Sequence, residues 1–211
     1  MRIYLIRHGQ TEWNASGRAQ GHSDVELDET GKRQAEVLAQ ALCDANIQRV
    51  FSSDLKRCVA TATPLVQMAG LQLEARSDLR ERTFGELEGA HYTEIRCWFN
   101  AECRERNLKE HEIRPEGGES LRDVWHRLEK FHRLVNNIRE SSVVFTHGGT
   151  CGLLLSRLMN GTVHTARSFR FENAGITELK KRQDGHWQLV RYCDTSHLSA
   201  LSDLSDESAT A

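Results

Sequence analysis

The 211-residue sequence predicts an α/β fold, a three-layer sandwich with a mainly parallel central sheet and helices on both faces. Two observations carry this prediction. Short apolar runs typical of buried strands recur along the chain, at residues 3–6, 49–52, 71–75 and 143–146. Helical patterns with one apolar face lie between the first three of these runs. Because strand and helix alternate in this way, we expect parallel strands joined by crossover helices.

The first two helices follow from their starting residues and their apolar stripes. Asp28 is a suitable N-cap for a helix with four apolar residues on one face, namely Ala35, Leu38, Ala39 and Leu42. The segment 52–54 can cap a second helix over about 55–63. Pro64 restricts the preceding residue, so we expect that helix to end there and a new turn or helix to begin.

The middle of the chain predicts a small helical lid over about residues 90–118. Residues 93–114 are rich in both charge signs, with Trp98 and Phe99 as apolar anchors, and Pro115 ends them. Ser120 then caps what we expect to be the longest helix. Its apolar stripe consists of Leu121, Val124, Leu128, Phe131, Val135 and Ile138.

The last third of the chain changes to a strand period. Residues 168–171, 176–181 and 187–192 are predicted strands, and Asp184-Gly185 is a hairpin turn between the last two. Residues 1–198 are therefore expected to form one domain. Residues 199–211 contain mostly Ser, Asp and Ala, and we expect them to be disordered.

Composition excludes several classes of protein. The net charge is −2 with no basic tract, which argues against nucleic acid as a partner. No apolar run approaches the length of a membrane span, and the chain runs directly into a strand, so we expect a cytoplasmic protein. No C-x-x-C pair occurs, so we predict no zinc site and six reduced thiols: Cys43, Cys58, Cys97, Cys103, Cys151 and Cys193.

Two of the predicted strands end in the same manner, one in Arg7-His8-Gly9 and the other in Thr146-His147-Gly148. If these strands are parallel neighbours, both imidazoles lie at the carboxyl edge of the sheet, where α/β folds bind ligands. Arg57 lies one turn into a helix that follows a strand, so it can point to the same edge. So much positive charge is costly without a compensating anion. Guanidinium groups bind phosphoryl groups bidentately, which predicts a phosphoryl site.

These residues belong to four motifs that resemble the histidine phosphatase superfamily, which contains cofactor-dependent phosphoglycerate mutase and fructose-2,6-bisphosphatase. The motifs are RHGQTEWN at 7–14, SSDLKRC at 52–58 with Thr61-Ala62, LRERTFG at 79–85 and THGG at 146–149. They occur in the family's order with suitable spacing, and the resemblance covers residues 1–198.

The resemblance implies a role for each residue of the predicted site. His8 is the nucleophile and becomes a phosphohistidine, while Glu81 donates a proton to the leaving group and later activates water. The phosphoryl oxygens are held by Arg7, Arg57 and His147. Accessory substrate contacts come from Thr11, Asn14, Gln20, Gly21 and the Gly148 amide. The chemistry agrees, because a neutral imidazole is a competent nucleophile and arginines supply the charge that a metal supplies elsewhere. We therefore predict neither metal nor cofactor.

Two assignments stay open from the residues alone. Glu86 and Glu88 share the loop with Glu81, and any of the three could be the acid; the motif favours Glu81. Of the remaining eight histidines, which we expect in surface or packing roles, His91 is the strongest candidate for the site because it follows this loop.

The basic residues of the lid could select an acidic substrate. Because they alternate with glutamates, we expect a solvated helix face instead. These residues are Arg104, Arg106, Lys109 and Arg114.

We predict a metal-independent phosphatase of small phosphorylated metabolites. One alternative is phosphoglycerate mutase, which needs dedicated cationic contacts to a second anionic group; the weak net charge of the lid favours hydrolysis. Another is a non-catalytic phosphate-binding scaffold, which the intact set of motif residues disfavours. The segment 115–120 resembles broad-specificity, alpha-ribazole-phosphate and phosphoserine phosphatases of bacteria and does not separate them. The oligomeric state stays open, with a homodimer as one option.

Overall fold

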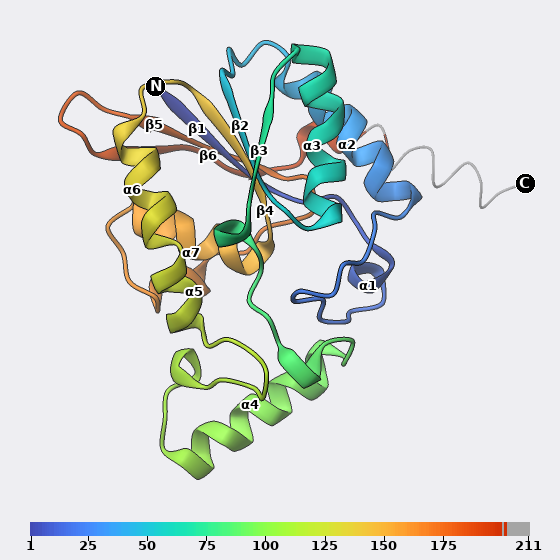
Figure 1. Ribbon diagram of the computed structural model, residues 1–211, viewed down its shortest axis with the longest axis vertical. Coiled ribbons are helices and arrows are strands. Elements are labelled where there is room, and N and C mark those ends of the chain that lie inside the picture. Colours follow the sequence, from blue (N-terminus) through green and yellow to red (C-terminus); the bar gives the residue numbers. More distant parts are fainter. Residues whose placement is uncertain (200, 202–211) are drawn as a thin grey trace, which may run out of the picture.

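A six-stranded mixed sheet forms the centre of the protein in the computed structural model, which describes residues 1–199 and 201 (Figure 1). The strands are β1 (Arg2–Arg7), β2 (Arg49–Ser53), β3 (Leu73–Arg76), β4 (Ser142–Thr146), β5 (Ile176–Lys181) and β6 (Trp187–Asp194). Their order is β3-β2-β4-β1-β5-β6. The first four are mutually parallel, and β5 and β6 extend the sheet in antiparallel fashion. The predicted tail lies outside the described residues, apart from Ser199 and Leu201.

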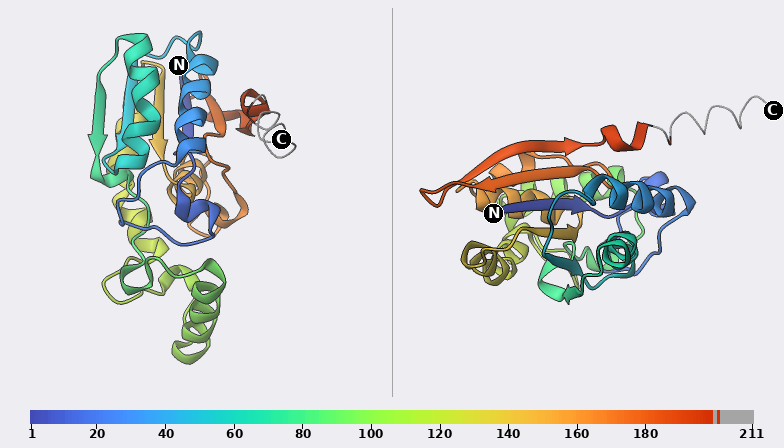
Figure 2. Two further views of the ribbon diagram at one scale, coloured as in Figure 1. Left: turned by 90° about the vertical axis from the view of Figure 1, so that its right-hand side faces the viewer. Right: turned by 90° about the horizontal axis from the view of Figure 1, so that it is seen from above.

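Helices cover both faces of the sheet, as the right-hand view of Figure 2 shows. One layer contains α2 (Glu29–Leu42) and α3 (Lys56–Ala69), and the other contains α5 (Leu121–Arg127), α6 (Glu129–Asn137) and α7 (Gly148–Leu158). Residues along β1 alternate between the two layers, because successive side chains of a strand point to opposite faces. Ile3 and Leu5 pack with the second layer, and Tyr4 and Ile6 with the first. The predicted three-layer α/β sandwich is confirmed.

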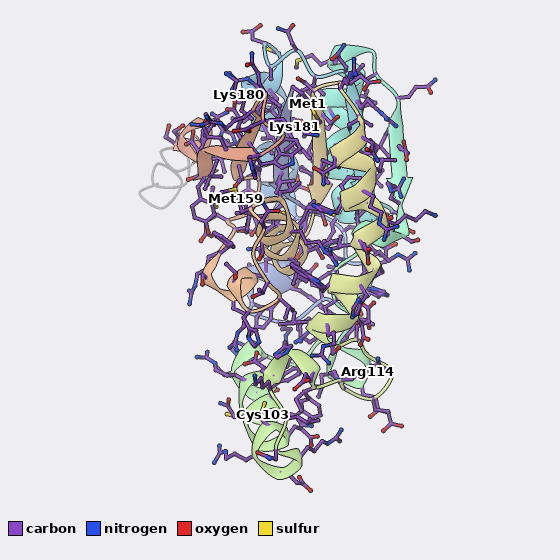
Figure 3. The ribbon with its side chains drawn as sticks, turned by 90° about the vertical axis from the view of Figure 1, so that its left-hand side faces the viewer. Met1, Cys103, Arg114, Met159, Lys180 and Lys181 are labelled. Carbon is purple, nitrogen blue, oxygen red and sulfur yellow. The ribbon has the colours of Figure 1, made fainter. Side chains whose placement is uncertain are left out.

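A helical lobe projects beyond the carboxyl ends of the parallel strands (Figure 1). It is built on α4 (Tyr92–Arg106) and a 3₁₀ turn at Glu110–Glu112, and short α1 (Glu12–Ala15) lies between it and the sheet. Five buried residues give the lobe its own small core: Ala19, Phe84, Ile95, Phe99 and Ile113. Figure 3 labels Cys103 and Arg114 in this lobe, at the opposite end of the molecule from Met1 and Lys181.

The helix that contains Pro64 does not end there, contrary to the sequence prediction. Helix α3 continues to Ala69 and closes with Gly70 in the left-handed conformation. Proline removes one hydrogen bond, to the carbonyl of Ala60. Ala60 is exposed, so water can satisfy that carbonyl. The N-cap residue is Leu55 and not a residue of 52–54, and the Asp24 carboxylate accepts from the Lys56 N–H at 2.8 Å. The predicted segment contributes only the Ser53 hydroxyl, which accepts from the Leu55 N–H at 3.4 Å.

Two further elements differ from the prediction. Residues 168–171 form no strand, because the hydroxyl of Tyr192 takes the backbone groups that a neighbouring strand would bind: it accepts from the Arg170 N–H at 2.6 Å and donates to the Arg170 carbonyl at 2.5 Å. The helix predicted from Ser120 is divided at Leu128 into α5 and α6. Its stripe still faces the core, since Val124, Leu128 and Phe131 are fully buried.

None of the helices formed by the described residues combines the length and the apolar character needed to cross a membrane.

Candidate active site

The carboxyl ends of β1 and β4 bring two histidines together. The strands are parallel neighbours with Arg7 opposite Thr146, and the His8 N–H donates to the Thr146 carbonyl at 2.9 Å. The rings of His8 and His147 therefore meet edge to face, with centroids 5.2 Å apart and an interplanar angle of 63°. The juxtaposition predicted from the two strand ends is present.

The ring of His8 is oriented by its own neighbour in the chain. Its Nδ1 lies 2.7 Å from the Gly9 carbonyl oxygen, which can only accept, so Nδ1 carries the proton and Nε2 the free lone pair. His8 is 3% exposed. Burial, followed by the charges of Arg57 and Arg7, holds the pKa of His8 well below its usual value. The imidazole is therefore neutral at physiological pH, as a nucleophile must be.

The Arg57 guanidinium forms the floor of the site. It is completely buried, and it donates to the carbonyls of Gly21 and Ser23 at 2.8 Å each and to Nδ1 of His147 at 3.3 Å. Arg57 therefore holds the loop that follows α1 against the sheet edge. Burial lowers the pKa of this guanidinium.

Arg7 approaches the same spot from the end of β1. Its Nη1 donates to the Phe171 carbonyl at 2.6 Å, and its Nε is buried with no hydrogen-bond partner among the described residues. Since a buried unpaired donor is costly, an anion at this point would satisfy it.

His147 is neutral in this arrangement. Because Nδ1 accepts from Arg57, the ring proton is on Nε2, which lies 2.9 Å from the Ser53 hydroxyl oxygen. Burial, followed by the charge of Arg57, holds the pKa of His147 well below its usual value. Ser53 and the Cys58 thiol, whose sulfur lies 3.4 Å from Nε2, position this ring; sequence analysis did not assign them that role.

The structure distinguishes the three candidate acids of the loop. Glu81 lines the site cavity. Its Oε2 accepts from the Gly149 N–H at 2.9 Å and its Oε1 from the Thr150 hydroxyl at 3.2 Å. Glu88 instead receives hydrogen bonds from the 22–23 and 83–84 segments, and its pKa is lowered despite burial by the bonds from Ser23 and its neighbours. Glu86 is exposed.

Four of the five predicted accessory residues line the same cavity: Asn14, Gln20, Gly21 and Gly148. Thr11 does not line it. The Thr11 hydroxyl instead donates to Oδ1 of Asn14 at 3.1 Å, and Asn173 Nδ2 donates to the same oxygen at 3.2 Å. The Asn14 amide nitrogen is thereby left for a ligand. His91 caps α4 through Thr93 and does not line the cavity.

The cavity has a volume of about 630 Å³ and extends from the two histidines to the lobe. Sequence analysis missed the arginines on its lobe side and on the facing segment, namely Arg82, Arg96, Arg167 and Arg170. The lid basic residues that it considered (Arg104, Arg106, Lys109 and Arg114) do not line the cavity. They are solvated or paired, as with Arg106–Glu102 and Arg114–Asp123. The solvated face expected for these four residues is present, and the positive charge of the cavity comes from other arginines.

A signal for Arg82 was present in the sequence, since it directly follows Glu81 within the LRERTFG motif. The positions of Arg167 and Arg170 depend on how the 162–175 segment folds back over the site, which no local pattern shows. Among the described residues, no group of three or more His, Cys, Asp or Glu side chains could hold a metal ion. All six cysteines are free thiols.

Comparisons with known proteins agree with this geometry. The chain is 33% identical to a probable phosphatase of Schizosaccharomyces pombe over 95% of this chain and 96% of that one. It is 31% identical to a probable phosphoglycerate mutase of Yersinia pestis, over 97% and 99% of the two chains. The structure of a mycobacterial glucosyl-3-phosphoglycerate phosphatase complexed with VO3 superposes with a TM-score of 0.79 at 29% identity, over 92% of this chain and 99% of that one. Residues 3–195 match the model of the histidine phosphatase superfamily (branch 1), and the chain belongs to that family.

Proposed function

We propose that this protein hydrolyses small phosphomonoesters in two steps, through a phosphohistidine at Nε2 of His8. The observation that carries the proposal is the orientation of His8: its Nδ1–H is bound to the Gly9 carbonyl, so the free lone pair on Nε2 lies beside Arg7, Arg57 and His147. A neutral nucleophile next to fixed cations suits phosphoryl transfer, where positioning and charge stabilisation supply most of the catalysis.

In the first step, Nε2 of His8 forms a bond to phosphorus while the bond from phosphorus to the alcohol oxygen breaks. Glu81 in its carboxylic acid form donates a proton to the leaving alkoxide. In the second step, water attacks phosphorus, the P–N bond breaks, and the Glu81 carboxylate takes the proton of the water. Inorganic phosphate leaves, and both residues return to their starting state.

The positive groups of the site take the place of a metal ion in this scheme. Arg7 and Arg57 bring two guanidinium groups, and the unpaired Nε of Arg7 is available to a phosphoryl oxygen. His147 provides a third contact from β4. We therefore propose a metal-independent reaction. The cytoplasmic location, the lack of a nucleic-acid partner and the homodimer considered above stay predictions.

A specific observation favours phosphoglycerate mutase as the second candidate. The lobe side of the cavity contains arginines that could hold the second anionic group of a bisphosphorylated intermediate. A similar probable mutase of Yersinia pestis adds weight. We still favour hydrolysis, because three of these four arginines are not free and buried: Arg167 is paired with Glu110 at 2.7 Å, and Arg96 and Arg170 are exposed. Only Arg82 is both buried and, among the described residues, unpaired, which is less than a bisphosphorylated intermediate needs.

The deciding experiment compares wild type with His8→Ala. We expect wild type to release phosphate from p-nitrophenyl phosphate and to form an acid-labile phosphoenzyme, and the variant to lose at least about a thousandfold in rate, roughly 4 kcal/mol in barrier. Retention of more than a few per cent of the rate would exclude a His8 nucleophile. Interconversion of 3- and 2-phosphoglycerate, primed with 2,3-bisphosphoglycerate, should be slower than the best hydrolysis by at least about a hundredfold. A mutase rate that equals hydrolysis would favour the second candidate.

A further inference from the structure

Asn173 lies behind the nucleophile, in the segment that leads into β5. Its Nδ2 donates to the His8 carbonyl at 2.8 Å and to Oδ1 of Asn14 at 3.2 Å. The side chain is half-buried and does not line the site cavity. Asn173 can therefore act on a ligand in that cavity only through the groups that it binds.

Backbone groups fix which way the two amides point. The His8 carbonyl can only accept, so the Asn173 atom beside it is the nitrogen. The Thr11 N–H can only donate and lies 3.2 Å from Oδ1 of Asn14, so that atom is the oxygen. The Thr11 hydroxyl accepts from the Asn14 N–H and donates to the same Oδ1, with 3.1 Å for each bond. Three donors therefore occupy Oδ1, and the NH₂ group of Asn14 is left for the cavity that this residue lines.

Of these three donors, only the Asn173 amide comes from outside the turn that carries Asn14. Thr11 and Asn14 form the capping box of α1, a helix of four residues, none of them buried. The Asn173 nitrogen ties this short helix to the end of β1, because it bridges Asn14 and the His8 carbonyl. Asn173 therefore helps to set where the Asn14 donor lies relative to the nucleophile.

The segment around Asn173 is itself bound to the end of β1. The Phe171 carbonyl accepts from Nη1 of Arg7 at 2.6 Å, and the Ala174 N–H donates to the Arg7 carbonyl at 2.9 Å. Ala174 has a φ of 56°, in the left-handed region that is unfavourable for a residue with a Cβ atom. Such a conformation persists only where the surrounding contacts require it. Here it places the Asn173 amide between its two acceptors.

We propose that Asn173 is a positioning residue: its amide keeps the carbonyl of Asn14 turned away from the cavity, so that the Asn14 NH₂ group faces the transferred phosphoryl group. This inference rests on the proposed phosphatase function. The two ends of an asparagine amide have almost the same size, but only the NH₂ end can donate to phosphoryl oxygens. The site therefore needs contacts that distinguish the two orientations, and Asn173 provides one of them.

The first test compares Asn173→Asp with Asn173→Ala. A carboxylate keeps the size of the side chain but only accepts, so it faces two acceptors and favours the reversed orientation of Asn14. Alanine removes the donor without adding an acceptor, and Thr11 still holds the Asn14 oxygen. The kcat/KM for p-nitrophenyl phosphate should fall at least about a hundredfold in Asn173→Asp and only about fivefold in Asn173→Ala. A packing role predicts the opposite order, because alanine leaves the larger void; that order would overturn the inference.

Asn136 provides the matched control. It is half-buried like Asn173, and its amide also makes two hydrogen bonds, with His132 and Trp187 at 2.9 Å each. It does not line the site cavity. Asn136→Asp and Asn136→Ala should therefore keep kcat/KM within about a factor of two of wild type. Losses as large as those of the corresponding Asn173 variants would reflect general destabilisation and would also overturn the inference.

A double-mutant cycle tests whether Asn173 acts through Asn14. In Asn14→Ala the donor is already gone, so adding Asn173→Ala should cost less than about twofold, against about fivefold when Asn14 is present. An equal cost in both backgrounds would contradict the proposed role. Circular dichroism checks that each variant is folded. If Asn173→Asp does not fold, the cycle decides alone, because it does not use that variant.

Calorimetric titration with inorganic phosphate separates this inference from the proposed function. The affinity should fall at least about tenfold in Asn173→Asp and stay unchanged in Asn136→Asp, because only the first variant disturbs a donor to the bound anion. If wild type hydrolyses no ester while the affinities follow this order, the phosphatase proposal alone fails. If wild type hydrolyses esters and binds phosphate no more tightly than Asn173→Asp, the Asn173 inference alone fails.

Discussion

The Nε–H of Arg57 donates to Nδ1 of His147 across 3.3 Å, so two groups that we assign to the phosphoryl oxygens contact each other directly. An oxyanion placed between them must replace this hydrogen bond. Arg57 can simply turn its donor to the anion. His147 must also become a donor at Nδ1, which it does most directly by taking up a proton, with Nε2–H remaining on Ser53.

Binding of a dianion should therefore be coupled to proton uptake. The pKa of His147 is well below its usual value in the free protein, and a bound dianion raises it. We expect the affinity for sulfate, which stays dianionic throughout, to rise at least about threefold between pH 7.5 and pH 6.0. Calorimetry at a series of pH values measures this, and His147→Gln should remove the dependence. A sulfate affinity that is the same at both pH values would contradict the coupling.

The two buried imidazoles should make the free protein less stable in acid. The pKa of His8 in the folded state lies far below its unfolded value, so the unfolded chain binds the additional proton. Stability from this source is complete above about pH 6.5 and is lost as the pH falls below it, at up to about 1.4 kcal/mol per pH unit. Urea titrations of wild type and His8→Asn at pH 7.5, 6.5 and 5.5 should show the shallower loss in the variant. His186→Asn, at an exposed turn position, serves as control; parallel curves for wild type and His8→Asn would refute the assignment.

Glu81 as the acid predicts a dependence on the leaving group. Glu81→Gln keeps the size of the side chain and removes the proton, so glycerol phosphate hydrolysis should fall by at least about a hundredfold. p-Nitrophenyl phosphate needs little protonation and should lose about tenfold or less. Steady-state rates on both esters measure this, with Glu86→Gln as an exposed control that affects neither. If both esters suffered equally, Glu81 would not be the acid.

A substitution at Gly149 tests the role of Glu81 independently. A Cβ atom at this position would lie 2.7 Å from Oε1 of Glu81, so alanine must displace the carboxyl group. Because the displaced group is the end of a flexible side chain and Gly149 is exposed, the fold should tolerate Gly149→Ala with less than about 1 kcal/mol lost. As in Glu81→Gln, the hydrolysis rate of Gly149→Ala should fall much more for glycerol phosphate than for p-nitrophenyl phosphate. Full activity on glycerol phosphate would show that Glu81 does not need its observed position.

Metal independence predicts activity in the presence of excess chelator. Rates measured after dialysis against EDTA should equal those of untreated protein within about a factor of two, because in the proposed scheme Arg7, Arg57 and His147 supply the positive charge around the transferred group. Vanadate, which resembles pentacoordinate phosphorus, should inhibit in the same buffer. Loss of activity in EDTA that Mg²⁺ restores would disprove the metal-free scheme.

The sheet and the edge that carries the candidate site could be predicted because they depend on local patterns. Apolar runs marked the parallel strands, and a polar motif directly followed two of them, so parallel pairing alone was enough to bring His8 and His147 together. Arg57 followed from its place one turn into a helix after β2. The antiparallel β5–β6 pair was also recognisable, through its Asp184-Gly185 turn.

What escaped prediction depends on contacts between distant segments. The carboxylate that accepts from the first N–H of α3 comes from Asp24, far away in the sequence, and the backbone of residue 170 is satisfied by the Tyr192 hydroxyl in place of a strand. Neither contact leaves a periodic signal. The same holds for Arg167 and Arg170, whose positions over the cavity are set by the fold of their segment. Charge counting along the lid examined Arg104 and Arg106, which face solvent, and overlooked Arg82, which the lobe buries.

The lobe on α4 has a core separate from the two that line the sheet. The residues to which we assign the phosphoryl chemistry come almost entirely from the sheet edge, whereas much of the remaining cavity wall comes from the lobe. We therefore expect mutations in the lobe to leave the proposed phosphoryl chemistry and the main fold largely undisturbed. Because the two parts are separate, the lobe can change during evolution while the sheet edge stays the same. Exchanging the lobe between relatives is therefore a rational way to engineer new substrate preferences.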